Sequence, residues 1–116
     1  MEDLNKIVKA SNREVYNNLS IEEYNKNESL FNEDRKKIYR ETLSFCSEKS
    51  GNESHLDIGT GTGNILRISQ GIFKRLYAID ISENILIKIR ESFPEVNFVA
   101  ADAENLPFKD NSFNCV

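Results

Sequence analysis

The sequence predicts an α/β fold in which a parallel sheet carries helices on both faces. Two observations lead to this prediction. Short apolar runs typical of strands alternate with segments whose apolar residues recur at helical spacing. A turn with three glycines, at 59–63, directly follows the first apolar run of the second half. Strands that alternate with helices imply right-handed crossovers, and ligands of such sheets bind outside the carboxyl ends of the strands.

The first half of the chain is expected to be helical. Residues 1–31 are polar and rich in Asn, and one or two helices there would carry an apolar stripe of Leu4, Ile7, Val8, Val15 and Leu19. Asn32 is a good N-cap for a longer helix, and Gly51 is a good stop for it. The side chains of this longer helix that we expect to face a core are those of Ile38, Thr42, Leu43 and Cys46.

The second half is expected to hold the sheet. The expected strands are 55–58, 76–79 and 96–99, with the start of a fourth at 113–116, and the expected helices cover 64–71 and the segment from Ser82 to Pro94. His55 is expected to be structural, because the sequence places no Ser or Cys partner near it. Cys46 and Cys115 lack metal-binding spacing, so we expect buried thiols and no metal site.

Length, composition and charge limit the function. The chain has 116 residues, which suits one small domain at 32–116 preceded by a helical cap segment at 1–31. Its net charge of −4 argues against a nucleic-acid partner, because nucleic-acid-binding domains carry a basic face. The sequence shows neither an apolar run near the ~20 residues of a membrane span nor a signal peptide at its start. We therefore expect a cytoplasmic protein without a membrane span.

The glycine turn is the strongest functional feature. Glycine lets the backbone bend sharply and lets a ligand approach without a Cβ in the way. The N–H groups at the start of the next helix can bind an anionic group. Asp57 precedes the turn, and its carboxylate would be costly to bury unpaired. It needs either a cationic partner, such as the ammonium group of a cofactor, or N–H donors from the turn.

Two further acids follow strands. Asp80 ends the second strand, where a carboxylate accepts hydrogen bonds from two ribose hydroxyls; the alternative is an exposed acid that caps the next helix. Asp102 follows the third strand, where it can accept from an adenine amino group while the next N–H reaches a ring nitrogen; the alternative is a loop-turn residue. Together with the glycine turn, these positions predict an adenosine-containing cofactor.

These residues resemble the class I S-adenosylmethionine-dependent methyltransferases, especially the small-molecule branch that includes the ubiquinone/menaquinone-biosynthesis type. The motifs at 57–63, 78–82 and 102–113 carry the resemblance, which covers roughly 53–116. It implies a Rossmann-like fold of which this chain is the cofactor-binding half, truncated after the start of strand 4. Strand 4 is interior in that family, so its exposed edge here predicts a homodimer or a partner strand.

The resemblance also implies roles for single residues. The glycine turn would hold the methionine part of S-adenosylmethionine, Asp80 the ribose, and the residues after the third strand the adenine edge. Tyr24 resembles a Tyr-Asp element that closes over the cofactor, although Asn25 replaces the acid and a packing role is equally open. The implied cofactor-binding residues are Asp57, Gly59, Thr60, Gly61, Gly63, Asp80, Ile81, Asp102, Ala103 and Tyr24.

The predicted function is the transfer of a methyl group from S-adenosylmethionine to a small-molecule acceptor. We assign no catalytic residue, because no side chain stands out as a general base. One alternative is a non-catalytic fragment or regulatory module that binds S-adenosylmethionine. Another is an NAD-dependent oxidoreductase, but its GxGxxG fingerprint requires a glycine where this chain has Asn64.

Overall fold

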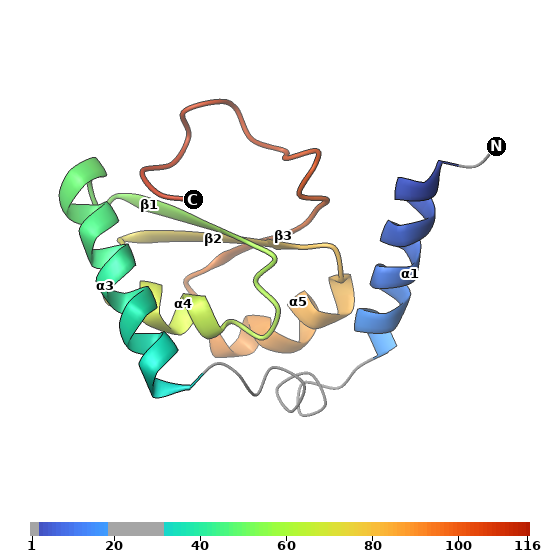
Figure 1. Ribbon diagram of the computed structural model, residues 1–116, viewed down its shortest axis with the longest axis horizontal. Coiled ribbons are helices and arrows are strands. Elements are labelled where there is room, and N and C mark those ends of the chain that lie inside the picture. Colours follow the sequence, from blue (N-terminus) through green and yellow to red (C-terminus); the bar gives the residue numbers. More distant parts are fainter. Residues whose placement is uncertain (1–2, 19–31) are drawn as a thin grey trace.

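Three strands form a parallel sheet in the order β1-β2-β3 (Figure 1). The computed structural model describes residues 3–18 and 32–116. The strands are β1 (Ser54–Ile58), β2 (Arg75–Asp80) and β3 (Asn97–Ala100). In the register, Leu56 lies opposite Tyr77, and Ala78 lies opposite Phe98. The predicted α/β fold with a parallel sheet is confirmed.

Helices cover one face of this sheet, whereas the sequence predicted helices on both faces; among the described residues, the segment after β3 that covers the other face forms no helix. The helices are α3 (Glu33–Ser50), α4 (Asn64–Ser69) and α5 (Glu83–Ile89), the last followed by the short 3-10 helix η1 (Arg90–Ser92). The N-terminal helix α1 (Leu4–Asn18) lies beside the carboxyl ends of the strands (Figure 1) and contacts the start of α5. The segment after β3 crosses the opposite side of the sheet and carries the chain to its C-terminus.

Successive side chains of β2 point alternately toward the helices and toward the segment after β3. Leu76 and Ala78 point toward the helices and join a buried cluster with Leu66 of α4 and Phe93. Tyr77 points to the other side, where its ring lies 5.1 Å from that of Phe113, centre to centre. The segment after β3 therefore covers the second face of the sheet with aromatic side chains.

The predicted helix caps are confirmed. The side chain of Asn32 accepts a hydrogen bond from the backbone N–H of Arg35, and Gly51 ends α3 with φ of 95°. Ser82 caps α5 by accepting from the N–H of Ile85. The helix predicted at 64–71 ends earlier, at Ser69.

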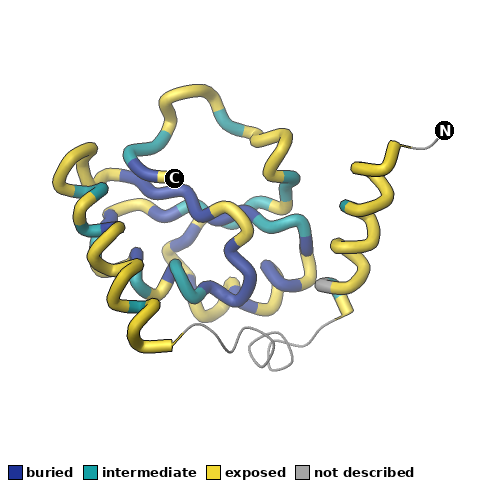
Figure 2. The backbone as a smooth tube through the Cα atoms, viewed as in Figure 1, coloured by how far each residue is buried: buried dark blue, intermediate teal, exposed yellow. Residues whose placement is uncertain are grey.

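The prediction of which α3 side chains face the core is partly wrong. Leu43 is buried, with 7% of its surface exposed, but Ile38 is 60% exposed. Figure 2 shows that most residues in the first half of α3 are exposed. Thr42 is exposed as well, and its hydroxyl donates to the carbonyl of Ile38 at 2.8 Å, so it satisfies its polar group without a core partner. Cys46 is half-buried, while Cys115 is buried as expected.

The fourth strand begins where the sequence predicts, but only as a single parallel bridge between His55 and Cys115. Its register is held by Asn114, whose Oδ1 accepts from the N–H of Ser54 and whose Nδ2 donates to the carbonyl of Ser50. His55 is buried, and burial lowers its pKa. The expectation that no Ser lies near it is wrong, because its Nδ1 contacts the Ser69 hydroxyl.

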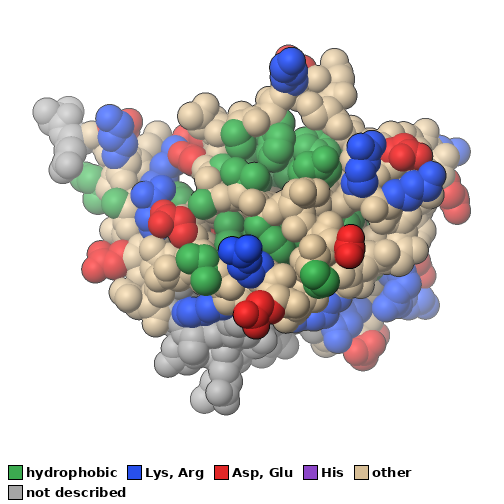
Figure 3. Space-filling view, turned by 180° about the vertical axis from the view of Figure 1, so that it is seen from behind, with side chains coloured by type: hydrophobic (Ala, Val, Ile, Leu, Met, Phe, Trp, Pro, Cys, Tyr) green, Lys and Arg blue, Asp and Glu red, His purple; other side chains and the backbone are tan. Residues whose placement is uncertain are grey.

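The outer surface combines apolar and charged side chains. Figure 3 shows hydrophobic side chains gathered near the middle of the side opposite to the view of Figure 1, with Lys, Arg, Asp and Glu around them. The predicted apolar stripe at the N-terminus lies on α1, but Leu4, Ile7, Val8 and Val15 are all exposed, and Leu19 lies outside the described residues. Within residues 3–18 and 32–116, no helix has the length and hydropathy of a membrane span.

Candidate functional site

A cavity of about 270 Å³ opens at the carboxyl ends of the three strands. Ligands of open α/β sheets bind at this edge, outside the carboxyl ends of the strands. Its volume lies just below the range of about 300–1,000 Å³ that is typical of small-molecule sites. It is lined by Ile58, Gly59, Ile79, Asp80, Ile81, Ala101, Asp102 and Ala103. The fold thus brings most of the predicted adenosine-binding residues to one place.

Asp80 anchors the glycine turn to the end of β2. Its Oδ2 accepts a hydrogen bond from the N–H of Gly61, and its Oδ1 accepts one from the N–H of Ser82, both at 2.9 Å. Each carboxylate oxygen can accept more than one hydrogen bond, so the side chain can still receive two ligand hydroxyls. The cap of α5 is Ser82, which removes the helix-capping alternative for Asp80.

The glycines of the turn serve two different purposes. Gly59, Gly61 and Gly63 all have positive φ angles, of 73°, 55° and 86°. A Cβ on Gly59 would meet no atom within 4 Å, so this glycine leaves space open at the cavity. A Cβ on Gly63 would lie 2.5 Å from the Phe93 ring, so this glycine permits close packing against the segment after α5.

Asp57 does not line this cavity but lines a separate hollow together with Leu43 and Cys46 of α3. Its side chain is 9% exposed, and its Oδ2 has no hydrogen-bond partner among the described residues; the same holds for Oγ1 of buried Thr60. The backbone N–H groups of Gly59 and Thr60 donate to the carbonyl of Ile79, so they do not serve this carboxylate. A buried carboxylate oxygen without a donor suits a cationic ligand group.

Burial raises the pKa of Asp57 from 3.8 to about 6. The Thr60 hydroxyl lies close enough to oppose this effect, although it does not form a hydrogen bond with Asp57 Oδ2, and the negative charge of Asp80 adds to the effect. Because the pKa is raised in the folded state, the free energy of unfolding falls as pH rises from 3.8 to about 6 and stays lower above that range.

Replacing Asp57 with Asn is therefore expected to stabilise the ligand-free chain at neutral pH. The free energy of unfolding is expected to rise by about 2 kcal/mol at pH 7, somewhat less than the roughly 3 kcal/mol that corresponds to the full pKa shift. Near pH 3.5, where Asp57 is protonated, we expect almost no gain. Urea unfolding of both proteins across this pH range measures the difference. Equal stabilities at pH 7 would contradict the uncompensated charge at Asp57.

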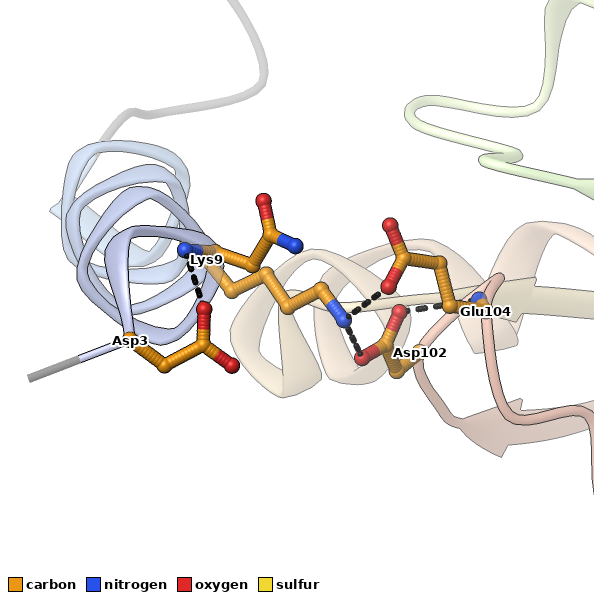
Figure 4. A network of polar contacts seen from close by, with 5 residues as sticks. Asp3, Lys9, Asp102 and Glu104 are labelled. Atoms are coloured by element: carbon orange, nitrogen blue, oxygen red, sulfur yellow. Dashed lines mark hydrogen bonds and ion pairs between the residues drawn. The ribbon is translucent and has the colours of Figure 1, made fainter.

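Asp102 is held by a residue that the sequence did not indicate. Lys9 Nζ of α1 lies 2.6 Å from Asp102 Oδ2 and 2.7 Å from Glu104 Oε2 (Figure 4). The other oxygen, Asp102 Oδ1, accepts from the N–H of Glu104, which closes a local turn. The Lys9 ammonium group holds the pKa of Asp102 below its usual value. Lys9 and Glu104 are 95 positions apart, and no local sequence pattern signals such a contact.

The remaining predicted residues have different outcomes. Ile81 and Ala103 line the cavity, whereas Thr60 and Gly63 belong to the turn but do not line it. Tyr24 lies outside the described residues. In the part of the chain that the structure describes, no group of three or more His, Cys, Asp or Glu side chains could hold a metal ion.

Known proteins with this architecture include methyltransferases. The S-adenosylmethionine-bound methyltransferase CalS10 of Micromonospora echinaspora matches 100% of this chain and 44% of its own, with a TM-score of 0.58 and 18% identity. An S-adenosylmethionine-dependent methyltransferase of Clostridium acetobutylicum matches 74% of this chain and 39% of its own, with a TM-score of 0.59 and 22% identity. At these identities the likeness shows the fold alone, and it confirms the predicted Rossmann-like class.

Sequence relatives narrow the family. The ubiquinone/menaquinone biosynthesis C-methyltransferase UbiE of Wigglesworthia glossinidia brevipalpis is 30% identical over 112 residues, which cover 89% of this chain and 44% of the relative. UbiE of Pseudomonas aeruginosa strain LESB58 is 37% identical over 86 residues, which cover 66% of this chain and 33% of the relative. This chain thus spans less than half the length of these relatives. The model of the methyltransferase domain family matches residues 56–116, which is more than half of the chain. The chain therefore belongs to this family, as its motifs predicted.

Proposed function

We propose that this chain binds S-adenosylmethionine and forms the cofactor-binding part of an enzyme that methylates a small molecule. The observation that carries this proposal is the cavity at the carboxyl ends of the strands, where Gly59, Asp80 and Asp102 meet. Membership of the methyltransferase domain family supports it. The names of the UbiE relatives, which are C-methyltransferases of ubiquinone/menaquinone biosynthesis, support a small-molecule acceptor.

The side chains fit the two ends of this cofactor. For the adenosine end, Asp80 offers free lone pairs for ribose hydroxyls, Ile81 an apolar surface for the adenine ring, and Asp102 an acceptor for the adenine amino group. For the amino-acid end, Asp57 offers a buried carboxylate oxygen without a partner. An ammonium group near it would remove the cost of ionising Asp57, whose pKa is raised to about 6.

The contribution of these residues is binding and orientation. When bound, the cofactor supplies an activated methyl group on a sulfonium centre. Fixing that group in line with an acceptor can lower the barrier by several kcal/mol, because less orientational freedom has to be lost during the reaction. The turn at 59–63 and Asp80 provide this fixing through the hydrogen bonds that join them. We assign no residue of this chain to proton transfer.

Calorimetric titration with S-adenosylmethionine, S-adenosylhomocysteine and NAD in parallel tests the proposal. We expect saturable binding of both sulfur compounds and none of NAD. Binding of NAD alone would favour the oxidoreductase alternative, and binding to none of the three by a folded chain would reject the site. Binding without methylation of any compound in a broad acceptor panel would favour the non-catalytic alternative.

Homodimerisation through the edge formed by Cys115 and Val116 is a further part of the proposal. Ile58, at the end of β1, exposes apolar surface, and the fourth strand forms a single bridge between His55 and Cys115 within the described residues. An apolar strand edge favours pairing with a second chain. Light scattering at high concentration tests this, and a monomeric mass would contradict it.

The absence of a nucleic-acid partner and a cytoplasmic location remain predictions, to be tested by nucleic-acid binding assays and cell fractionation.

A further inference from the structure

A second hollow, of about 470 Å³, opens between α3 and α4, which contact each other (Figure 1). It is separate from the cavity at the carboxyl ends of the strands, because the two share no lining residue. Its volume lies within the range that is typical of small-molecule sites. It is lined by Lys36, Arg40, Asn64, Arg67, Ile68 and Gly71. Half of these residues are cationic and none is acidic.

The chain itself balances this positive charge only weakly. Lys36 pairs with Glu33 at 3.1 Å, but the Glu33 side chain is 87% exposed, and an exposed pair contributes little. Among the described residues, no carboxylate forms an ion pair with Arg40 or Arg67. Lys36 and Arg40 are one helical turn apart on the same side of α3, where like charges repel. An anion in the hollow would relieve this repulsion.

The side chain of Arg67 is oriented before any ligand binds. Its Nη1 donates to Asn64 Oδ1 at 3.3 Å, and its guanidinium carbon lies 5.3 Å from the centre of the Phe93 ring. The other N–H groups of the guanidinium stay available, since the hydrogen bond to Asn64 uses one of them. A guanidinium fork fixed in this way matches the oxygen atoms of a phosphate group.

Gly71 keeps the hollow open. A Cβ on this residue would have only the carbonyl oxygen of Ile68 within 4 Å, at 4.0 Å. A concave surface lined by charges of one sign concentrates its field, and it therefore attracts a small counter-ion more strongly than a flat surface does. This excess of positive charge is local, because the chain as a whole carries a net charge of −4.

We propose that the hollow between α3 and α4 binds a small phosphate-bearing anion, held by Arg40 and Arg67 and assisted by Lys36. Arg67 offers its preformed fork to the phosphate oxygens, and Arg40 adds a second guanidinium from the facing helix. Lys36 can exchange its exposed partner Glu33 for the ligand. The proposal is independent of the proposed function, since none of these residues lines the cofactor cavity.

Calorimetric titration of the full chain with inorganic pyrophosphate, in a phosphate-free buffer of low ionic strength, tests the proposal. We expect saturable binding to one site, which weakens as salt is added. Arg40→Gln and Arg67→Gln are each expected to weaken it about three- to ten-fold, between the values for an exposed ion pair and for a hydrogen bond to a charged group. In nuclear magnetic resonance spectra, the backbone amide signals of Arg67 and Gly71 are expected to shift with pyrophosphate.

Two matched controls separate the hollow from the general charge of the chain. Arg35→Gln removes the same charge from the same helix, but Arg35 does not line the hollow, so the affinity is expected to stay unchanged. Gly71→Glu places a carboxylate at the hollow and is expected to abolish binding. Gln70→Glu adds the same charge at an exposed neighbour outside the lining and is expected to reduce affinity far less. Thermal unfolding verifies that each variant is folded.

Several results would overturn the anion site. These are the absence of saturable pyrophosphate binding, an equal loss of affinity in Arg35→Gln and Arg40→Gln, and competition between pyrophosphate and S-adenosylhomocysteine, which would put the anion in the cofactor cavity. Binding to vesicles that contain phosphatidylserine, without binding to pyrophosphate, would assign the cations to a membrane surface and would also overturn it. A chain that binds pyrophosphate as expected but no S-adenosylhomocysteine would retain the anion site and reject only the proposed function.

Discussion

Replacing Asp80 with alanine is expected to weaken the binding of S-adenosylhomocysteine by roughly 100-fold or more. Two hydrogen bonds from ribose hydroxyls to a carboxylate would be lost, and hydrogen bonds to charged groups contribute about 1.5–3 kcal/mol each. The substitution also removes the acceptor that holds the N–H groups of Gly61 and Ser82. Calorimetric titration measures the affinity, and thermal unfolding verifies that the variant is folded.

Asp80→Asn separates the two effects of this side chain. The amide retains one oxygen, which can accept from Gly61 or from Ser82, so the turn keeps part of its anchor while the charge is lost. We expect an affinity between those of the wild type and the alanine variant. Asp110→Ala is the control, because Asp110 is an exposed acid outside the cavity lining. An unchanged affinity of Asp80→Ala would show that this carboxylate does not bind the ribose.

Local patterns predicted the fold well where packing and propensity agree. The strands and the caps at Asn32 and Ser82 lie within a residue or two of their expected places. Helical spacing alone did not predict which side chains of α3 are buried. Ile38 and Leu43 are five residues apart, which places them about 140° apart around the helix. Leu43 faces the domain, so Ile38 points away from it and is exposed.

The site was predictable to a similar degree. Parallel strands bring their carboxyl ends to one edge, so residues at the ends of β2 and β3 had to come together. The ion pair between Lys9 and Asp102 was not predictable, because it depends on how α1 lies against the domain, and no spacing rule relates these two residues. The unpartnered oxygen of Asp57 is likewise a property of the folded turn, whose N–H groups turned out to donate elsewhere.

Alanine substitutions at Gly63 and Gly59 are expected to separate stability from binding. At Gly63 the positive φ alone costs about 1–2 kcal/mol for alanine. Its Cβ would also lie 2.5 Å from the Phe93 ring, which is buried in the core and cannot move freely. Overpacking costs about 1–3 kcal/mol more. The total of about 2–5 kcal/mol is a large share of the stability of a small domain, and urea unfolding measures it.

Gly59→Ala meets the same backbone cost but no clash, so we expect a loss of only about 1–2 kcal/mol. Its Cβ projects into the open space beside the cavity, where it would obstruct a ligand that approaches the turn. The variant should therefore fold and bind S-adenosylhomocysteine at least 10-fold more weakly, an obstruction of about 1.4 kcal/mol or more. Wild-type affinity in Gly59→Ala would mean that the ligand does not contact the turn. A stable Gly63→Ala protein would mean that Phe93 can move away from the turn, because the contact between them is the main cause of the expected loss.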